Sequence, residues 1–326
     1  MNAVLPGLLL LSCLVGCESS PPEETAAPED SAAPVETRLP TVYLMERYLG
    51  DLFALDRETS ELLWTLSGLN ATVGLAVDAE GFIYLGVTDS DFVGSIVRVP
   101  PDGSAAEVLV PPDGTLLRPQ GLWYDAATDT VLFADVNADL IYEMELDGFT
   151  LSVLTDKVPE PSDAARRPGE ETLYVTARGE GKVYVVTEDG TATALAASVP
   201  DAHSLVPGQD GVVYVLSTAN KTLLEIDEAT GVATTLASGF STIGPVGLCI
   251  DHAAGGLLMT DHAGGTLFHY DFVTGEVTAL FTSEDDVYEC GHNDPPDADH
   301  DGYIAESHAG TDCDDRDASV HPGEGC

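Results

Sequence analysis

The last thirty residues of the chain carry carboxylates at the alternate spacing that hard divalent cations require. Asp297, Asp299 and Asp301 follow the pattern D-x-D-x-D-G, and Gly302 permits a sharp turn after them. Ca²⁺ takes about six to eight oxygen ligands, and this spacing directs three carboxylates at one point. Tyr303 would add its backbone carbonyl. The segment therefore predicts a calcium site.

The same loop departs from a standard EF-hand at its end. Position twelve is His308, where an EF-hand has a bidentate glutamate, and Glu306 comes two residues too early. The loop therefore needs further ligands. A second carboxylate cluster supplies them if the chain folds back across the segment IAESHAG, namely Asp312, Asp314, Asp315 and Asp317.

The order of these features is D-x-D-x-D-G-Y, then G-x-D-C-D-D-x-D, then Pro322-Gly323. It resembles the metal-binding motif typified by the bacterial surface protein MopE. The resemblance implies an extracytoplasmic calcium site formed by Asp297, Asp299, Asp301, Tyr303, Asp312, Asp314, Asp315 and Asp317. One alternative is an acidic, disordered tail, because runs of like charge repel one another. Another is copper or zinc bound through His292, His300, His308 and His321.

The N-terminus indicates where the protein resides. Residues 1–16 form an apolar stretch too short to span a bilayer as a helix, and they end in Leu14-Val15-Gly16-Cys17. This ending resembles the lipobox of bacterial lipoprotein signal peptides. The resemblance implies cleavage before Cys17, lipidation of Cys17, and attachment to the cell envelope as an outer-membrane or cell-surface lipoprotein. The alternative is a plain secretory signal that is cleaved elsewhere.

Residues 17–38 are rich in Pro, Ala, Ser and Glu and nearly free of large apolar side chains. Such a segment cannot bury enough surface to fold. We therefore expect a disordered linker that holds the folded part away from the membrane.

Charge limits the partners of the chain. With 12 Lys and Arg against 56 Asp and Glu, the formal net charge is −44, which repels nucleic acid and anionic membrane surfaces. Once Cys13 is removed with the signal and Cys17 is lipidated, four cysteines remain, which suits an oxidising compartment. We predict disulfides between Cys313 and Cys326 and between Cys249 and Cys290. Free thiols are the alternative.

The middle of the chain repeats a short pattern of apolar runs and glycine-rich turns. Successive units begin about 40 to 47 residues apart, at Val73, Gln120, Asp163, His203 and Val246. Runs of four to six apolar residues between Asp-Gly, Thr-Gly and Gly-Gly turns indicate strands and hairpins. Four strands per repeat of this length are typical of a propeller blade.

A partial unit before Val73, with TVYLM, GDLFALD and ELLWTLS, gives three strands of one further blade. The sequence therefore predicts an all-β, six-bladed β-propeller over residues 39–284. Its first blade lacks an inner strand, and the residues after Ser283 offer only Val287 and Tyr288 as apolar candidates. A gap or an irregular strand is expected where the ring closes.

The units resemble NHL repeats and the gluconolactonase-like six-bladed propellers, most closely in LFADVNADLIYEMELDG at residues 132–148. In that family the residue before the glycine of each inner strand points toward the axis, where lactonases hold a divalent ion. The resemblance places Val73, Gln120, Asp163, His203 and Val246 there. Gln120, Asp163 and His203 could form a poor metal site, and a hydrogen-bonded polar plug is the alternative.

The sequence thus predicts a lipid-anchored, extracytoplasmic propeller with an acidic metal-binding tail at residues 285–326. The expected function is that of a binding or scaffold protein, with a protein, a glycan or a small molecule as its ligand. The alternative is a metal-dependent lactonase or hydrolase of the gluconolactonase type. A third interpretation makes metal capture by the tail the main function.

Overall fold

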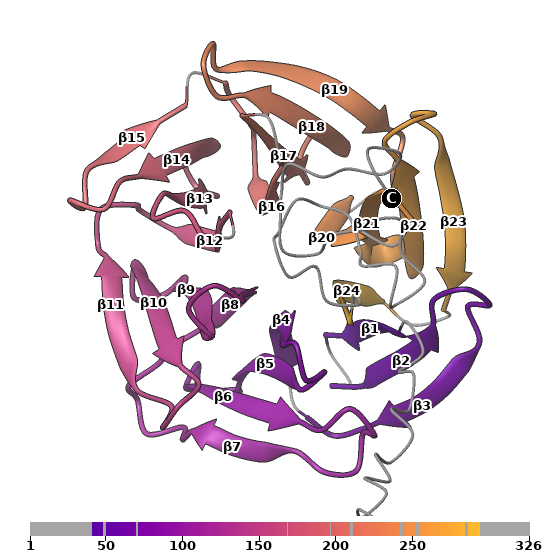
Figure 1. Cartoon of the computed structure of the whole chain (residues 1–326). Helices are drawn as coiled ribbons and strands as arrows, with labels where there is room; N and C mark the ends of the chain where they lie inside the picture. The colour runs from indigo at the N-terminus through magenta and orange to yellow at the C-terminus, as the bar shows by residue number, and fades with distance from the viewer. Residues whose placement is uncertain are drawn as a thin grey trace, which may run out of the picture. The chain divides into compact units, whose positions relative to one another are not determined.

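The computed structural model describes residues 41–47, 50–69, 71–167, 169–195, 197–208, 211–241, 244–251, 254–283 and 286–293. Within them the strands form six four-stranded antiparallel sheets, which are the blades of a propeller. Figure 1 shows the blades around a common axis, with β4, β8, β12, β16, β20 and β24 innermost. The predicted all-β, six-bladed propeller is confirmed. Among these residues, no helix is long and apolar enough to cross a membrane.

The blades are described from their inner to their outer strand. Blade 1 is β24 (Val287–Asn293), β1 (Thr41–Glu46), β2 (Leu52–Asp56) and β3 (Leu62–Leu66). Blade 2 is β4 (Ala71–Val77), β5 (Ile83–Thr88), β6 (Gly94–Val99) and β7 (Glu107–Val110). Blade 3 is β8 (Pro119–Asp125), β9 (Thr130–Asp135), β10 (Leu140–Glu145) and β11 (Leu151–Thr155). Blade 4 is β12 (Pro161–Arg166), β13 (Leu173–Ala177), β14 (Lys182–Val186) and β15 (Ala192–Ala194).

Blade 5 is β16 (Ala202–Pro207), β17 (Val212–Ser217), β18 (Thr222–Asp227) and β19 (Val232–Ser238). Blade 6 is β20 (Pro245–Asp251), β21 (Gly256–Asp261), β22 (Thr266–Asp271) and β23 (Val277–Thr282). A short 3₁₀ helix, η1 (His262–Gly264), follows β21. The second strand of a blade is rich in β-branched and aromatic residues and buried on both faces, as in IYLGVT of β5. The outer strands are largely exposed.

The hairpins between the third and the outer strand show how local sequence sets the blade. In blades 1, 5 and 6 this turn has the sequence Asp-x-x-Thr followed by Ser or Gly. In blade 5, the side chain of Asp227 accepts a hydrogen bond of 2.7 Å from the Thr230 N–H. Gly231 then adopts a φ of 66°, a conformation that glycine tolerates without steric cost.

The apolar core lies between neighbouring blades. One cluster joins blades 1 and 2 through Tyr43, Met45, Leu75 and Leu85, all of which are buried. Equivalent clusters fill the other interfaces. Each blade is therefore stabilised mainly by its two neighbours, so the ring depends on being closed.

The ring closes through its last strand without a gap, and the pairing of that strand with β1 shifts register between Met45 and Glu46. β24 supplies the inner strand that the first blade lacks in the sequence, and it pairs with β1 from Thr41↔Asn293 to Glu46↔Val287. Val287 and Tyr288, the two apolar candidates, are both buried in it. The described propeller thus extends to Asn293, beyond residue 284 where the sequence placed its end.

A disulfide joins the two sides of this closure. Cys249 of β20 is bonded to Cys290 of β24, so blade 6 is linked covalently to blade 1. This is the predicted pairing. The other predicted pair, Cys313 and Cys326, lies outside the described residues, as do the predicted signal peptide, the linker at residues 17–38, Cys17 and the eight predicted calcium ligands.

Candidate functional site

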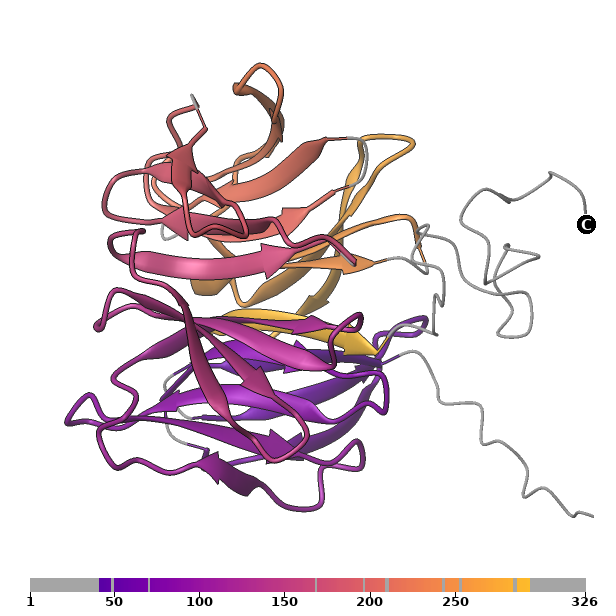
Figure 2. The same ribbon diagram turned by 60° about the vertical axis from the view of Figure 1, so that its left-hand side comes forward.

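The six inner strands surround the axis and all run along it in the same direction, so the propeller has two distinct faces. Thr41 and Asn293, where the described chain enters and leaves the ring, pair with each other at one face, which we call the proximal face. The inner strands begin at the opposite face, which we call the distal face. In Figure 2 the tip of β24 and the start of β1 lie at the same side of the ring.

Close contacts between successive inner strands reveal which positions are equivalent. A Cβ on Gly121 would lie 2.6 Å from the Asp163 Cα, and one on Gly247 would lie 2.9 Å from the Glu289 Cα. Because each glycine contacts the equivalent residue of the next inner strand, Asp163 in blade 4 and Glu289 in blade 1 are equivalent to these glycines. The glycines at this position are Gly74 in blade 2, Gly121 in blade 3 and Gly247 in blade 6. The residues one position earlier, toward the distal face, are Val73, Gln120, Ser162, His203, Val246 and Tyr288.

This register corrects the sequence-based assignment of Asp163. The sequence placed Asp163 with the axial residues that precede the glycines, but Ser162 holds that position. Blade 4 has no glycine to mark the register, and the pairing of Asp163 with Thr176 puts Asp163 one residue further along the strand. We call the six equivalent residues that include Gln120 and His203 the axial layer. Asp163 lies outside this layer, so the expected ligands Gln120, Asp163 and His203 are not at equivalent positions.

His203 and Tyr288 form the polar centre of the axial layer. The His203 Nε2 atom lies 2.9 Å from the Tyr288 hydroxyl and 3.4 Å from the Gln120 amide nitrogen. Because an amide nitrogen only donates, the His203 Nε2 atom accepts here. Burial, followed by the positive charge of Arg178, lowers the pKa of His203 to about 3, so the imidazole is neutral. Val73 and Val246 pack beside Tyr288 and are the apolar members of the layer, while the Ser162 hydroxyl donates to the His203 carbonyl oxygen.

Asp163 is committed to the contact between blades 4 and 5. Its Oδ2 atom accepts hydrogen bonds from the Ser204 hydroxyl at 2.7 Å and from the Leu205 N–H at 2.9 Å. Its Oδ1 atom accepts one from the Ala164 N–H at 2.8 Å. Burial raises the pKa of Asp163 to about 6. The carboxylate joins two blades, while Gln120 and His203 contact each other.

Glu289 is a buried carboxyl that the sequence did not single out. It is only 5 % exposed, and among the described residues its backbone pairs with Met45 while no hydrogen bond to its carboxyl is found. Burial, with a further contribution from the charge of Asp163, raises the pKa of Glu289 well above its ordinary value. Aligning VYEC with the inner strands would have revealed a glutamate at a glycine position, but that required identifying residues 287–293 as the closing strand.

The described residues contain no group of three or more His, Cys, Asp or Glu side chains close enough to hold a metal ion. The axial polar groups instead satisfy one another across blades 1, 3 and 5. This is the geometry of a hydrogen-bonded plug.

Positively charged and aromatic groups surround this plug at the distal face. The Arg47 guanidinium lies 4.8 Å from the centre of the Tyr288 ring, within the range of a cation–π interaction. The rings of His203 and His262 approach Tyr288 edge-on, with centroids 5.6 Å and 5.1 Å away. The His262 Nε2 atom lies 3.6 Å from the Asp286 carboxylate. Tyr288 is therefore held from several blades.

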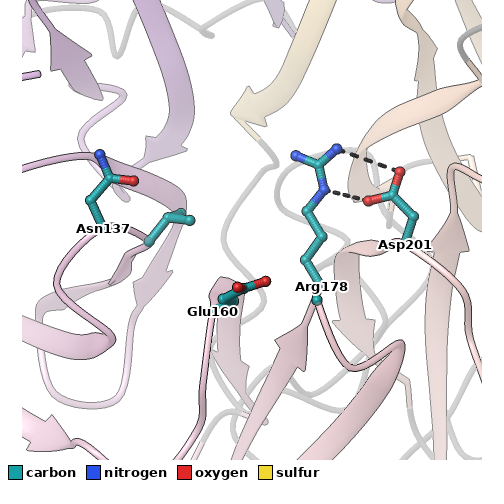
Figure 3. Close-up of a pocket in the computed structure, with 6 residues that line it drawn as sticks. Asn137, Glu160, Arg178 and Asp201 are labelled. Atoms are coloured by element: carbon teal, nitrogen blue, oxygen red, sulfur yellow. Dashed lines mark hydrogen bonds and ion pairs between the residues drawn. The ribbon is translucent and has the colours of Figure 1, made fainter.

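A cavity of about 410 Å³ lies at the distal face where loops of blades 3, 4 and 5 meet. Figure 3 shows its polar lining, in which Arg178 pairs with Asp201 beside Glu160 and Asn137. The Arg178 Nη2 atom lies 3.4 Å from the Asp201 Oδ2 atom, and its Nε atom donates to Oδ1. Arg178 also places positive charge near His203 and Tyr288.

Comparison with known proteins places the chain by its fold. No protein-family model and no curated protein matches it. A chain of the crystallised nidogen/laminin complex superposes with a TM-score of 0.64 at 17 % identity, covering 78 % of this chain and 98 % of that one. A protein of unknown function from Bacteroides caccae gives 0.61 at 12 % identity, covering 78 % and 99 %. A streptogramin B lyase gives 0.50 at 15 % identity, covering 75 % and 74 %. At these identities the likeness establishes the fold alone.

Proposed function

We propose that this protein is a lipid-anchored, extracytoplasmic binding protein whose propeller presents its distal face to a ligand and whose tail binds calcium. The observation that carries the proposal is the pairing of Thr41 with Asn293. Because the described chain enters and leaves the ring at the proximal face, a tether ending at Thr41 and a tail beginning after Asn293 both attach there. The distal face, with its arginines and its cavity, lies opposite the attachment.

Two further features support this assignment. The Cys249–Cys290 disulfide suits an oxidising, extracytoplasmic compartment. The nidogen/laminin complex offers an example of a chain of this fold in an assembly of two proteins. The lactonase alternative finds no comparable support, because the Asp163 carboxylate is engaged by donors from blade 5.

Lipid attachment is tested at Cys17. When the chain is expressed in a bacterial host with labelled palmitate, the wild type is expected to incorporate label, because the lipobox-like sequence directs acylation of this thiol. Cys17→Ser is expected to lose the label and to leave the membrane fraction. Cys13→Ser is the control and should label as the wild type does. Equal labelling of the Cys17 variant would contradict the lipid anchor.

Calcium binding is tested by calorimetry on the whole purified chain. We expect a dissociation constant on the order of 10⁻⁵–10⁻³ M, which spans weak sensors to extracellular modules. Replacing Asp299 and Asp301 together by Ala should abolish the binding, because it removes two of the three alternately spaced carboxylates. The matched control replaces Asp89 and Asp91, two exposed propeller aspartates with the same spacing. Binding that survives in the tail variant would place the ligands elsewhere.

A further inference from the structure

The distal cavity is built from loops of three blades, and its lining is mostly polar. Its volume of about 410 Å³ falls within the range of small-molecule sites in proteins, roughly 300–1,000 Å³. The lining comes from the β9–β10 turn, from the β13–β14 turn and from the residues that directly precede β12 and β16. The six lining residues are Val136, Asn137, Glu160, Arg178, Gly179 and Asp201.

The backbone of Glu160 is held at this cavity in a conformation that favours glycine. Its φ is 44°, whereas the same position before the inner strand has Asp201 at 53° in blade 5 and Gly244 at 94° in blade 6. Aspartate and glycine tolerate this region better than glutamate does. The Glu160 N–H donates to the Asp139 carboxylate at 2.8 Å, and the Glu160 carbonyl oxygen accepts from the Arg178 N–H at 3.1 Å. A glutamate fixed in this strained conformation points to a role for its side chain.

The Glu160 carboxylate lies against the backbone of Gly179. A Cβ on Gly179 would overlap the Glu160 Oε2 atom, so the carboxylate can occupy this place only beside a glycine. Within the described part of the chain, no hydrogen-bond donor and no Lys or Arg side chain pairs with this carboxylate. The Arg178 guanidinium is turned instead toward Asp201, to which its Nε and Nη2 atoms donate (Figure 3). Among the described residues, the cavity thus holds one ion pair and one carboxylate with unused acceptors.

The charge and the lining of the cavity favour a ligand with a positively charged donor group. Two carboxylates against one guanidinium leave the lining with one negative charge, and the whole chain carries −44, so its field attracts cations. An ammonium group has three donors and no acceptor. These donors suit the Glu160 carboxylate and the amide oxygen of Asn137, both of which belong to exposed residues. Val136 offers apolar surface to the carbon chain that carries the ammonium group.

We propose that the distal cavity binds the primary ammonium group of a ligand, with the Glu160 carboxylate as its counter-ion and Asn137 as a second acceptor. The group can belong to a small amine or to a lysine side chain of a partner protein, because both present an ammonium group at the end of an alkyl chain. The inference rests on the proposed binding function of the distal face and names its ligand class. The lipid and calcium experiments do not depend on it, so either can fail without the other.

The test is calorimetry on the full chain in calcium-free buffer at constant ionic strength, with butylamine and the end-blocked peptide Ala-Lys-Ala as probes. At least one probe is expected to bind saturably with one site per chain. Butanol and end-blocked Ala-Met-Ala, which lack the charge, are expected not to bind. Tighter binding of the peptide would indicate a lysine of a partner protein, and tighter binding of butylamine a small amine. The absence of saturable binding by both amines would overturn the proposal.

Variants at the cavity identify the groups that hold the probe. Glu160→Gln is expected to weaken the binding by about tenfold or more, because a charge-assisted interaction is lost while the side chain keeps its shape. Gly179→Ala keeps every charge and should also weaken it, because the added Cβ displaces the carboxylate. Glu188→Gln is the matched control in the exposed turn after β14 of the same blade, and it should bind within about twofold of the wild type. Unchanged affinity in Glu160→Gln would show that the carboxylate is not the counter-ion and would overturn the proposal.

Thermal unfolding without a probe separates binding from a structural role. Glu160→Gly should unfold at the same temperature as the wild type or a few degrees higher, because glycine adopts a positive φ without steric cost. The same variant should lose the binding, since the carboxylate is gone. A fall of its unfolding temperature by more than about 5 °C would show that Glu160 serves the contact between blades 3 and 4 rather than a ligand, and the proposal would fail.

Discussion

A chain that ends before Val287 is expected to be unfolded, whereas a chain that ends after Asn293 should unfold at nearly the same temperature as the whole protein. Residues 287–293 form the inner strand of blade 1 and contact the inner strands of blades 2 and 6. Burial of Val287, Tyr288 and Cys290 removes three side chains from water, and each large one contributes about 1.5–3 kcal/mol. That loss is comparable with the roughly 5–15 kcal/mol by which a folded domain is stable.

Circular dichroism during heating measures this directly. The chain ending after residue 286 should show no cooperative transition, and the chain ending after Asn293 provides the control for loss of the tail alone. A cooperative transition in the shorter chain, within about 10 °C of the control, would show that the ring does not need its closing strand. The comparison also shows that a deletion of the tail has to begin after Asn293, because a deletion that begins at residue 285 would remove all of β24.

The sequence revealed the propeller because five blades repeat one pattern within about 40 to 47 residues. Alternating apolar runs and Asp-Gly or Thr-Gly turns are local signals, and they predict strands wherever they occur. Closure is different, because blade 1 joins Thr41 to Asn293 across nearly the whole chain. The closing strand VYECGHN has few apolar residues, so its own sequence is a weak signal for a strand. Its position is determined by pairing with the edge of β1 that would otherwise be unpaired.

The candidate site was harder to predict from the sequence, because its residues also come from distant parts of the chain. Gln120 and His203 were found because a glycine or a similar small residue follows each of them, but blade 4 has Asp163 at that position, and the register slipped by one. Tyr288 and Glu289 lie on the closing strand. Arg47 and Arg178 come from loops of two blades that no sequence spacing connects. Only the closed ring brings Gln120, His203 and Tyr288 together, which is why their hydrogen bonds appear in the structure and in no motif.

The second prediction concerns the bond across the same closure. Breaking the Cys249–Cys290 disulfide is expected to lower the free energy of unfolding by about 4 kcal/mol, the loop-entropy value for cysteines 41 residues apart. The bond ties β24 to β20, so its loss frees the closing strand on its blade 6 side. Denaturant unfolding of the chain ending after Asn293, with and without reductant, isolates this disulfide from Cys313 and Cys326.

Two single variants distinguish the covalent link from packing. Cys249 is partly exposed and Cys290 is buried among Leu44, Leu258 and Val287, so Cys290→Ala also loses packing and should be the less stable of the two. Cys249→Ala should match the reduced wild type within about 1 kcal/mol, because it loses little besides the bond. Neither variant should respond further to reductant. If reductant leaves the wild-type midpoint unchanged, the closure is held by β24 packing alone, and the effect of deleting the strand has to come entirely from its sheet pairing and its buried side chains.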